Sequence, residues 1–195
     1  VARRRVGDNP GVAEDAPDLI VIGERVALGP LRRDLAATYA RWVNGPEVRE
    51  GLLNLGIDTP ETVEAWVDEQ VKKAAERPPA AAHFTIYDRS DDAPVGTVGL
   101  FDISYVHSSA ELGIAIGERR HRGLGTEATR LMLLWAFRTL GLHNVILGAL
   151  AWNEGALRAY ERAGFRRIGV RRGGAVSRGE RVDVVLMDAI PDDLA

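Results

Sequence analysis

The sequence predicts a single α/β domain with a mixed, mostly antiparallel sheet of about seven strands and about four helices packed on it. Two observations carry this prediction. The chain has 195 residues, 46% of them hydrophobic, which is enough for one buried core and short for two domains. Segments with the two-residue period of strands also alternate with segments of helical period. The domain is expected over residues 19–190, between a flexible tail at 1–18 and a short tail at 191–195.

The first half of the chain is expected to hold one strand and two helices. Residues 25–28 have the pattern of a short strand, and residues 31–43 carry apolar side chains at helical spacing. A second helix is expected from the sequence DTPE at 58–61, where a capping residue precedes a proline and an acid. It should end by the prolines at 78 and 79.

Three strands are expected next, over residues 83–88, 95–105 and 111–116. Short links of turn-forming residues separate them, so they should form an antiparallel meander. The remaining expected elements are a helix from Thr126 to Leu140 closed by Gly141, a strand over 144–152, a helix over 153–163 closed by Gly164, and strands over 165–170 and 182–187.

Charge and cysteine content restrict the ligands and partners. The formal net charge of -3 lacks the basic excess of a nucleic-acid-binding protein, so any anion site must be local. The chain has no cysteine, which excludes disulfides, a thiolate nucleophile and thiolate metal ligands. The four histidines lack the paired spacing of a metal site, so no metal is expected. Without a long apolar run or a signal-peptide pattern, a cytoplasmic protein that binds neither membrane nor nucleic acid is the simplest expectation.

The segment RRHRGLGTEA, residues 119–128, has the features of an anion site. Gly123 and Gly125 let the backbone approach a ligand closely, and the helix expected from Thr126 offers unpaired N–H groups and the positive end of its dipole. The spacing fits neither the Walker loop nor the dinucleotide fingerprint, so neither ATP nor NAD is favoured. A glycine-containing turn with solvated arginines would give the same short pattern. Three arginines are expected to add mobile positive charge at the rim, namely Arg119, Arg120 and Arg122.

The pattern R-x-x-G-x-G at residues 120–125, between a strand and a helix, resembles the Q/R-x-x-G-x-G/A motif of the GNAT family of N-acetyltransferases. In that family this loop binds the pyrophosphate of coenzyme A. Residues 153–165 (NEGALRAYERAGF) resemble the family's second signature, an asparagine, a tyrosine seven residues later and a Gly-Phe pair. Residues 25–48 are similar to the RimJ/RimL-like and spermidine-acetyltransferase-like branches. The resemblance spans roughly residues 20–190 and implies the GNAT fold and acetyl-CoA as cosubstrate.

The resemblance also implies where the cofactor lies. Backbone of the strand before the loop would hold the pantetheine arm, and the N–H of Ile114 would polarise the thioester carbonyl. The cofactor-binding residues expected on this basis are Ile114, Ala115, Ile116, Arg120, His121, Arg122, Gly123, Leu124, Gly125, Thr126 and Asn153.

Two catalytic groups are expected. Tyr160 stands where many family members have a tyrosine that protonates the departing thiolate. The alternative role for this residue is structural, with its ring packed on the sheet. Glu111 is the leading candidate for the base that removes a proton from the acceptor ammonium, directly or through water. The alternative is that Glu111 has no catalytic role and is a solvated carboxylate at a strand end. Lesser candidates for binding or deprotonating the amine are Glu47, Asp58, Asp102 and His107.

The implied function is acetyl transfer by direct attack, in a ternary complex, on a primary amine of a small molecule such as a polyamine or an amine-bearing antibiotic or metabolite. Many RimJ/RimL-type members have an apolar residue in place of Tyr160 and a serine in place of Ala156, which favours the small-molecule branch. A protein N-terminal acetyltransferase and a non-catalytic acyl-CoA-binding module stay open, and a homodimer is plausible. The arginines over 166–181 could contact the cofactor or simply solvate a hairpin. Acids around the second helix favour a cationic acceptor: Asp58, Glu61, Glu64, Asp68 and Glu69.

Overall fold

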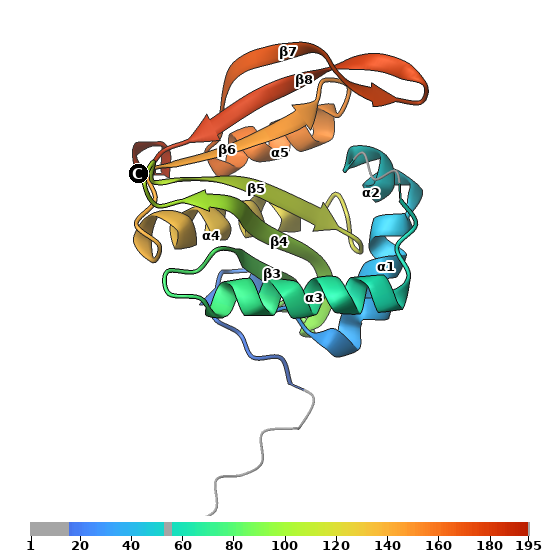
Figure 1. Ribbon diagram of the computed structural model, residues 1–195, viewed down its shortest axis with the longest axis vertical. Coiled ribbons are helices and arrows are strands. Elements are labelled where there is room, and N and C mark those ends of the chain that lie inside the picture. The colour runs from blue at the N-terminus through green and yellow to red at the C-terminus, as the bar shows by residue number, and fades with distance from the viewer. Residues whose placement is uncertain (1–15, 53–55, 195) are drawn as a thin grey trace, which may run out of the picture.

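The computed structural model describes residues 16–52 and 56–194, whose strands form one eight-stranded sheet (Figure 1). The strand order is β1-β2-β3-β4-β5-β6-β8-β7, and every neighbouring pair is antiparallel except β5 and β6, which are parallel. The strands are β1 (Val21–Ile22), β2 (Val26–Pro30), β3 (Ala82–Asp88), β4 (Ala93–Ser104), β5 (Ser109–Ile116), β6 (Asn144–Leu150), β7 (Arg166–Ser177) and β8 (Glu180–Ala189).

Helices cover both faces of the sheet. In Figure 1, α3 lies in front of the strands, and α4 and α5 lie behind them. None of the helices in the described part of the chain is both long and apolar enough to cross a bilayer. The helices are α1 (Ala36–Asn44), α2 (Pro46–Gly51), α3 (Pro60–Ala75), α4 (Leu124–Arg138) and α5 (Glu154–Ala163), with 3-10 helices η1 (Arg33–Leu35) and η2 (Pro191–Leu194).

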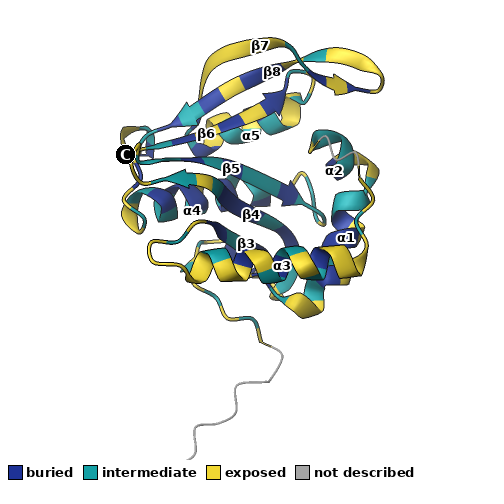
Figure 2. Ribbon diagram, viewed as in Figure 1, coloured by how far each residue is buried: buried dark blue, intermediate teal, exposed yellow. Residues whose placement is uncertain are grey.

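Two main apolar cores, with a small third cluster around Leu150 and Val184, hold these layers together. The larger lies between the sheet and α4, where Ile86, Leu100 and Met132 are fully buried. The smaller lies between α1, α3 and the strand region, around Tyr39 and Val67. Each such side chain contributes roughly 1.5–3 kcal/mol by leaving water. Figure 2 shows the result, with buried residues along the strands and exposed residues on the outer side of α3 and along β7.

The predicted order of strands and helices is confirmed, as is the antiparallel meander of β3, β4 and β5. Two elements were not predicted, β1 and α2, because a two-residue strand shows no period and a six-residue helix starting at Pro46 follows a turn-like Asn-Gly. Residues 191–194, expected as a tail, form η2, and Leu194 is buried in the larger core. The expected tail at 1–18 lies mostly outside the described residues.

The β5–β6 pair has a feature that positions the site. Its register covers only residues 109–111 of β5 and 144–146 of β6. Beyond Glu111, β5 continues against β4 alone, while β6 continues against β8. The two parallel strands therefore diverge, and we call the opening between them the β5–β6 gap. One edge of β5 at residues 112–116 has no neighbouring strand, so its backbone N–H and C=O groups can bind a ligand.

Candidate active site

The loop between β5 and α4 has an unusual backbone. Arg119, His121 and Gly123 have φ angles of 52°, 61° and 79°, whereas the intervening residues are not among those with positive φ. Left-handed conformations are uncommon for residues other than glycine, so two of them in one short loop indicate a constrained backbone. Alternating left- and right-handed residues turn successive N–H groups toward one point and so create a concave anion site. Gly123 is also the N-cap of α4 and makes no side-chain capping bond, so the first N–H groups of that helix add to the site.

Glycine is required at two positions of this loop for different reasons, namely backbone conformation and space. Gly123 adopts the left-handed conformation that ends the loop. At Gly125 a Cβ would lie 3.2 Å from Cγ1 of Ile116, so a side chain there would push the first turn of α4 away from the end of β5. The absence of that side chain keeps the loop beside the β5–β6 gap.

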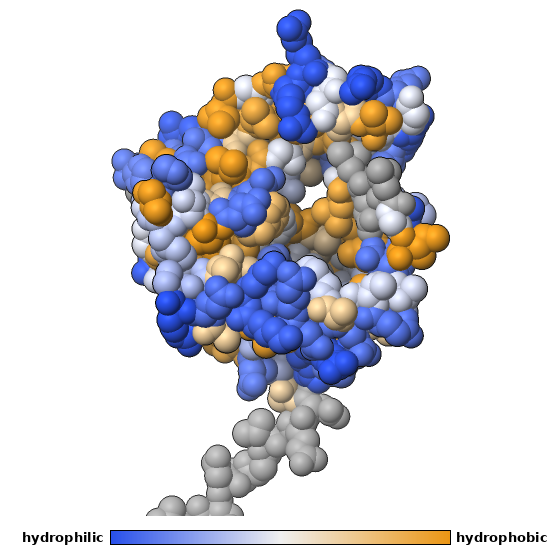
Figure 3. Space-filling view, viewed as in Figure 1, coloured by the Kyte–Doolittle hydropathy of each residue, from blue (hydrophilic) through white to orange (hydrophobic). Residues whose placement is uncertain are grey.

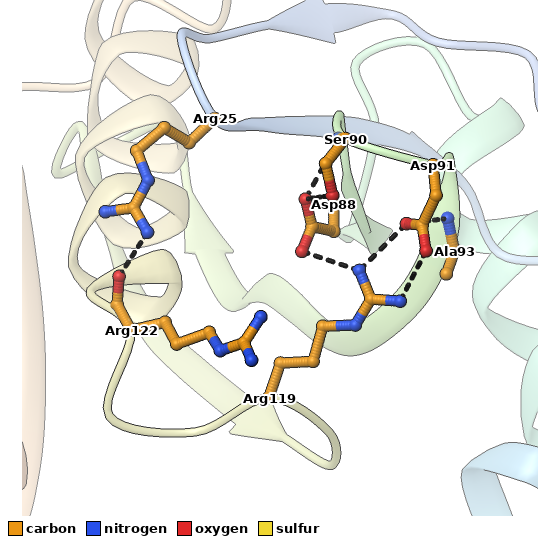
Figure 4. Close-up of polar contacts among 7 residues, drawn as sticks. All are labelled: Arg25, Asp88, Ser90, Asp91, Ala93, Arg119 and Arg122. Atoms are coloured by element: carbon orange, nitrogen blue, oxygen red, sulfur yellow. Dashed lines mark hydrogen bonds and ion pairs between the residues drawn. The ribbon is translucent and has the colours of Figure 1, made fainter.

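Arg119 does not have the mobility that was expected of it. Its guanidinium donates to Asp88 at 2.7 Å and to Asp91 at 2.5 Å (Figure 4). Asp88 is buried, and it also accepts hydrogen bonds from the backbone N–H and hydroxyl of Ser90. These partners hold the pKa of Asp88 well below its usual range, with the Arg119 hydrogen bond the largest cause. Because a buried carboxylate needs such partners, Arg119 is an anchor that ties the loop to the β3–β4 turn.

The expectation of a mobile side chain is also wrong for Arg120. Its Nε donates to the carbonyl oxygen of Ile116 at 2.8 Å, and Nη1 forms an ion pair with Glu47 of α2. Glu47, a lesser candidate for binding the amine, is therefore already paired.

Arg122 is the arginine of the three that keeps an available side chain. Its guanidinium has no polar partner in the described part of the chain, and its carbonyl accepts a 2.5 Å hydrogen bond from Arg25 (Figure 4). Arg25 also lies beside Gly123, where a Cβ would be 3.2 Å from its Nη1. The sequence did not point to Arg25, because it stands far away along the chain and outside any motif.

The predicted thioester-binding residues lie on the free edge of β5. Ile114 and Ala115 line a cavity described below, and Ile116 leads directly into the loop. The side chains of Ile114 and Ile116 pack against the larger core, as their apolar character alone would predict. His121, Leu124 and Thr126 of the predicted set follow in the loop and the first turn of α4.

Tyr160 lies on α5 with its ring partly buried against the larger core. The ring meets Phe165 edge to face at a centroid distance of 6.0 Å. Tyr160 therefore has the packing role that was considered as the alternative to a catalytic one. Its hydroxyl has no hydrogen-bond partner among the described residues. Burial raises the pKa of Tyr160 to about 12, and the phenol is therefore protonated throughout the neutral range. Tyr160 does not line the cavity, and α5 adjoins α4.

Asn153 caps α5, and its side-chain oxygen accepts from the N–H of Ala156 at 3.2 Å. Its Nδ2 faces the end of α2, where a Cβ on Gly51 would lie 3.8 Å away. The start of α5 and the end of α2 therefore lie next to each other.

Glu111 is the last residue of β5 that pairs with β6, at the closed end of the β5–β6 gap. It is half-buried, and burial is the largest cause that raises its pKa; the charge of Asp102 raises it further and Arg171 opposes the shift. Side chains alternate along a strand, so Glu111 lies on the same face of β5 as Gly113 and Ala115. His107, another lesser candidate, is exposed in the turn between β4 and β5.

A cavity of about 290 Å³ lies between α1, α3 and the strands β3 to β5. Figure 3 shows a hollow on this side of the molecule, bordered by apolar side chains. Its walls include Tyr39, Trp66 and His83, none of which was predicted, and both Gly113 and Ala115 of β5. The cavity thus opens onto the same stretch of β5 that borders the β5–β6 gap.

The acids expected to attract a cationic acceptor mostly point elsewhere. Arg33 pairs with Glu64 at 3.1 Å and with Asp68 at 3.6 Å, and Lys73 pairs with Glu69 at 2.6 Å. Glu61 is exposed at the start of α3. Of the five, Asp58 is the one that lines the cavity.

His83 is a neutral part of the cavity wall. Burial lowers its pKa to about 4, and Nδ1 is buried without a hydrogen-bond partner. The ring meets Trp66 edge to face at 5.5 Å. The imidazole also occupies the space beside Gly99. A Cβ on Gly99 would lie 2.0 Å from Cδ2 of His83. A larger residue at 99 would displace the imidazole.

Most of the carboxy-terminal arginines are engaged within the domain. Arg166 pairs with Asp193 at 2.5 Å and Arg167 with Glu161 at 2.8 Å. Arg178, in the turn between β7 and β8, pairs with Glu50 of α2 and lies over the ring of Trp152. These contacts favour a structural role for this stretch.

Comparison with known sequences and structures agrees with this arrangement. Residues 25–166 match the family model described as Acetyltransferase (GNAT) domain. The Probable N-acetyltransferase YjcK of Bacillus subtilis is 38% identical over 115 residues, 57% of this chain and 63% of that protein. The spermidine N(1)-acetyltransferase of Vibrio cholerae is 34% identical over 88 residues, 44% of this chain and 50% of that protein. The aligned regions thus span less than two thirds of these relatives.

Solved structures share the fold at low identity. Spermidine N-acetyltransferase from Vibrio cholerae, in complex with CoA and spermine, superposes with a TM-score of 0.78 at 22% identity, covering 87% of this chain and 98% of that one. Ribosomal-protein-S5-alanine acetyltransferase from Vibrio fischeri gives 0.79 at 20% identity, covering 91% and 100%. The family model covers well over half of the sequence, and it shows that this chain belongs to the GNAT acetyltransferase family.

Proposed function

We propose that the protein transfers the acetyl group of acetyl-CoA to the primary amine of an acceptor, by direct attack in a ternary complex. The observation that carries the proposal is that three features meet on one strand. The anion-binding loop follows β5, the free edge of β5 borders the β5–β6 gap, and the cavity opens onto residues 113–115 of the same strand. Such an arrangement places an anionic cofactor and an acceptor on either side of one backbone segment. We propose that residues 19–190 form the acting domain, to which η2 adds the buried side chain of Leu194.

The residues of the loop suit a diphosphate. The left-handed residues His121 and Gly123 and the first turn of α4 would direct backbone N–H groups toward the ligand, the dipole of α4 adds positive potential, and the Arg122 guanidinium is available at the rim. Acetyl-CoA would supply the activated acetyl group as a thioester. The free edge of β5 at Ile114–Ile116 would hold its pantetheine arm, with one N–H, that of Ile114, polarising the carbonyl. Asn153 would contact the cofactor from the start of α5.

Proton transfers are assigned to two residues. Glu111 takes a proton from the acceptor ammonium, directly or through water, and its raised pKa makes the carboxylate a better base than an exposed one. Tyr160 gives its phenolic proton to the sulfur as the C–S bond breaks and the new C–N bond forms, and it regains a proton from the second one that the nitrogen loses as it becomes an amide. Its protonated state at neutral pH and its unpartnered hydroxyl support this role.

The acceptor is proposed to be a small-molecule amine. A cavity of about 290 Å³ is near the lower limit of the roughly 300–1,000 Å³ of small-molecule sites, which supports this choice over a long polymer segment. A protein amino terminus is the alternative, since one structural neighbour is named for a ribosomal-protein alanine and another for spermidine.

The test combines turnover with binding. The purified protein is mixed with acetyl-CoA and separate amines, namely polyamines, aminoglycosides and short peptides with free amino termini, and release of the CoA thiol is followed. A parallel titration measures CoA affinity. Release with one class of amine is expected. Tight CoA binding without release across the panel would instead favour a non-catalytic acyl-CoA-binding module, and absence of CoA binding would refute the assignment of the loop.

We further propose a homodimer that works in the cytoplasm. The edge strand β7 exposes Ile168, Val170 and Val176, each more than half accessible, and an edge strand offers unpaired backbone groups to a second copy. The phosphates of acetyl-CoA hinder its passage through a bilayer, which supports an enzyme on the side where the cofactor is made. Light scattering of the purified protein tests the dimer.

A further inference from the structure

We infer that the acceptor is a primary amine carried on an apolar or aromatic group, and that the cavity between α1, α3 and β3–β5 selects that group over a polyamine. This inference rests on the proposed function and adds the class of acceptor to it. A free arylalkylamine and a peptide that begins with an apolar residue share this chemistry.

The first argument is the composition of the walls. Tyr39 and Trp66 contribute aromatic surface, and Val43 and Val63 contribute aliphatic surface. His83 adds a ring that is neutral at physiological pH and is held against Trp66. A mostly apolar cavity with a few polar groups binds apolar ligands and uses the polar groups to orient them. Here the polar groups include Thr97, on the β4 side, and Asp58, at the start of α3.

The second argument is charge. A polyamine carries several ammonium groups, and each must be paired if it leaves water. Among the described residues that line the cavity, Asp58 is the one that carries a carboxylate, which is too little negative charge to pair the several ammonium groups of a polyamine. The acids of α2 beside it are already engaged, because Glu47 pairs with Arg120 and Glu50 pairs with Arg178. The acids of the outer side of α3 pair with Arg33 and Lys73.

The third argument is that contacts within the protein hold the aromatic side chains of the cavity wall in place. The imidazole of His83 occupies the volume where a side chain on Gly99 would stand, and Gly99 lines the cavity too. Tyr39 is held by a 2.5 Å hydrogen bond between its hydroxyl and that of Thr85. The aromatic surface is therefore fixed before an acceptor binds, which favours flat or branched apolar groups over a flexible charged chain.

The experiment compares second-order rate constants at saturating acetyl-CoA. The acceptors are 2-phenylethylamine, a short peptide with an amino-terminal leucine, and spermidine. We expect kcat/KM for at least one apolar amine to exceed that for spermidine by tenfold or more. Hydrophobic pockets discriminate between substrates by about this factor for a single apolar group. Whichever of the two apolar amines reacts faster identifies the source of the amine.

A pair of variants tests the role of the cavity itself. Leu52 lines the cavity and is 45% exposed, so a polar residue there is compatible with folding. Leu52→Glu is expected to raise kcat/KM for spermidine relative to the apolar amine by about tenfold, since it adds a second carboxylate. Leu52→Gln, with the same shape and no charge, is the control and should leave the ratio closer to that of the wild type.

The outcomes separate the two proposals. Preference for spermidine in the wild type, or an equal shift of the ratio in both Leu52 variants, would overturn the apolar-acceptor inference and leave the proposed acetyl transfer standing. No turnover with any amine, together with tight CoA binding, would overturn the proposed function and this inference with it.

Discussion

The cofactor side and the acceptor side of β5 are built on different principles. The loop from β5 to α4, which we propose as the diphosphate site, offers mainly backbone N–H groups, and charged side chains such as Arg119 hold it in shape. The cavity on the other side has side-chain walls from α1, α3 and three strands, with one carboxylate among them. From this difference we expect diphosphate binding to depend on backbone conformation, and acceptor choice to depend on side chains that can change without disturbing the proposed cofactor site.

The largest effect is expected for Tyr160→Phe, which removes the proposed acid while it keeps the ring on Phe165. We expect kcat to fall by roughly 10³-fold, within the usual range for a general acid, with little change in CoA affinity. Steady-state kinetics and a CoA titration measure the two. Tyr105→Phe is the matched control, because Tyr105 is exposed and its hydroxyl donates to the Pro79 carbonyl. An unchanged kcat in Tyr160→Phe would remove this residue from the mechanism.

Glu111→Gln tests the acceptor side. A loss of about 10²-fold in kcat/KM for the amine is expected, because the amide cannot take a proton. Burial raises the pKa of Glu111, so wild-type kcat/KM should rise with pH as this carboxylate ionises, and the variant should lack that limb. Glu180→Gln, at the turn of the β7–β8 hairpin, is the control. The assignment fails if both variants keep the wild-type profile.

A smaller effect is expected on the cofactor side, where two arginines should behave differently. Arg122→Ala removes an available cation, so we expect the Kd for CoA to rise about tenfold at low salt and less at high salt. Arg119→Ala removes an anchor from the loop and leaves Asp88 buried without it, so its loss of affinity should be largely independent of salt. Titrations at two ionic strengths compare them, and identical salt dependence would contradict the distinction between anchor and ligand.

The smallest effect concerns stability on the acceptor side. The pKa of His83 is about 4 in the folded protein and 6.5 in its ordinary environment, so the unfolded chain binds this proton first as the pH falls. The free energy of unfolding should therefore decrease as the pH falls from 6.5 toward 4, and this group should account for a loss of up to about 3 kcal/mol. Denaturant unfolding of wild type and His83→Gln at both pH values measures it. Equal pH dependence of the two proteins would show that His83 is not shielded from protonation.

The sequence predicts the loop side of β5 better than the cavity side. The loop and the start of α5 were found because Gly123, Gly125, Gly164 and Asn153 meet backbone requirements that restrict residue type locally. The order of strands and helices followed from hydrophobic period. The parallel β5–β6 pair and the reversed order of β8 and β7 could not be predicted, because neighbouring strands in the sheet need not follow one another along the chain.

The cavity could not be predicted for a related reason. Tyr39, Trp66 and His83 come from three elements, and each has the apolar or aromatic character expected of any core residue. The two aspartates that bind Arg119 were also missed, because ion pairs between distant segments leave no local pattern. As a result, three mobile arginines were expected where the structure shows one available guanidinium.

The left-handed residues of the loop have a kinetic consequence. Arg119 and His121 take up their unfavourable φ angles when the chain folds, and the contacts of Arg119 with the β3–β4 turn maintain the local bend before any ligand arrives. In the proposed function, such a preformed loop would lose little conformational entropy when the diphosphate binds. We therefore expect binding in a single step whose rate is set by diffusion and orientation, with no slow closing phase after the encounter.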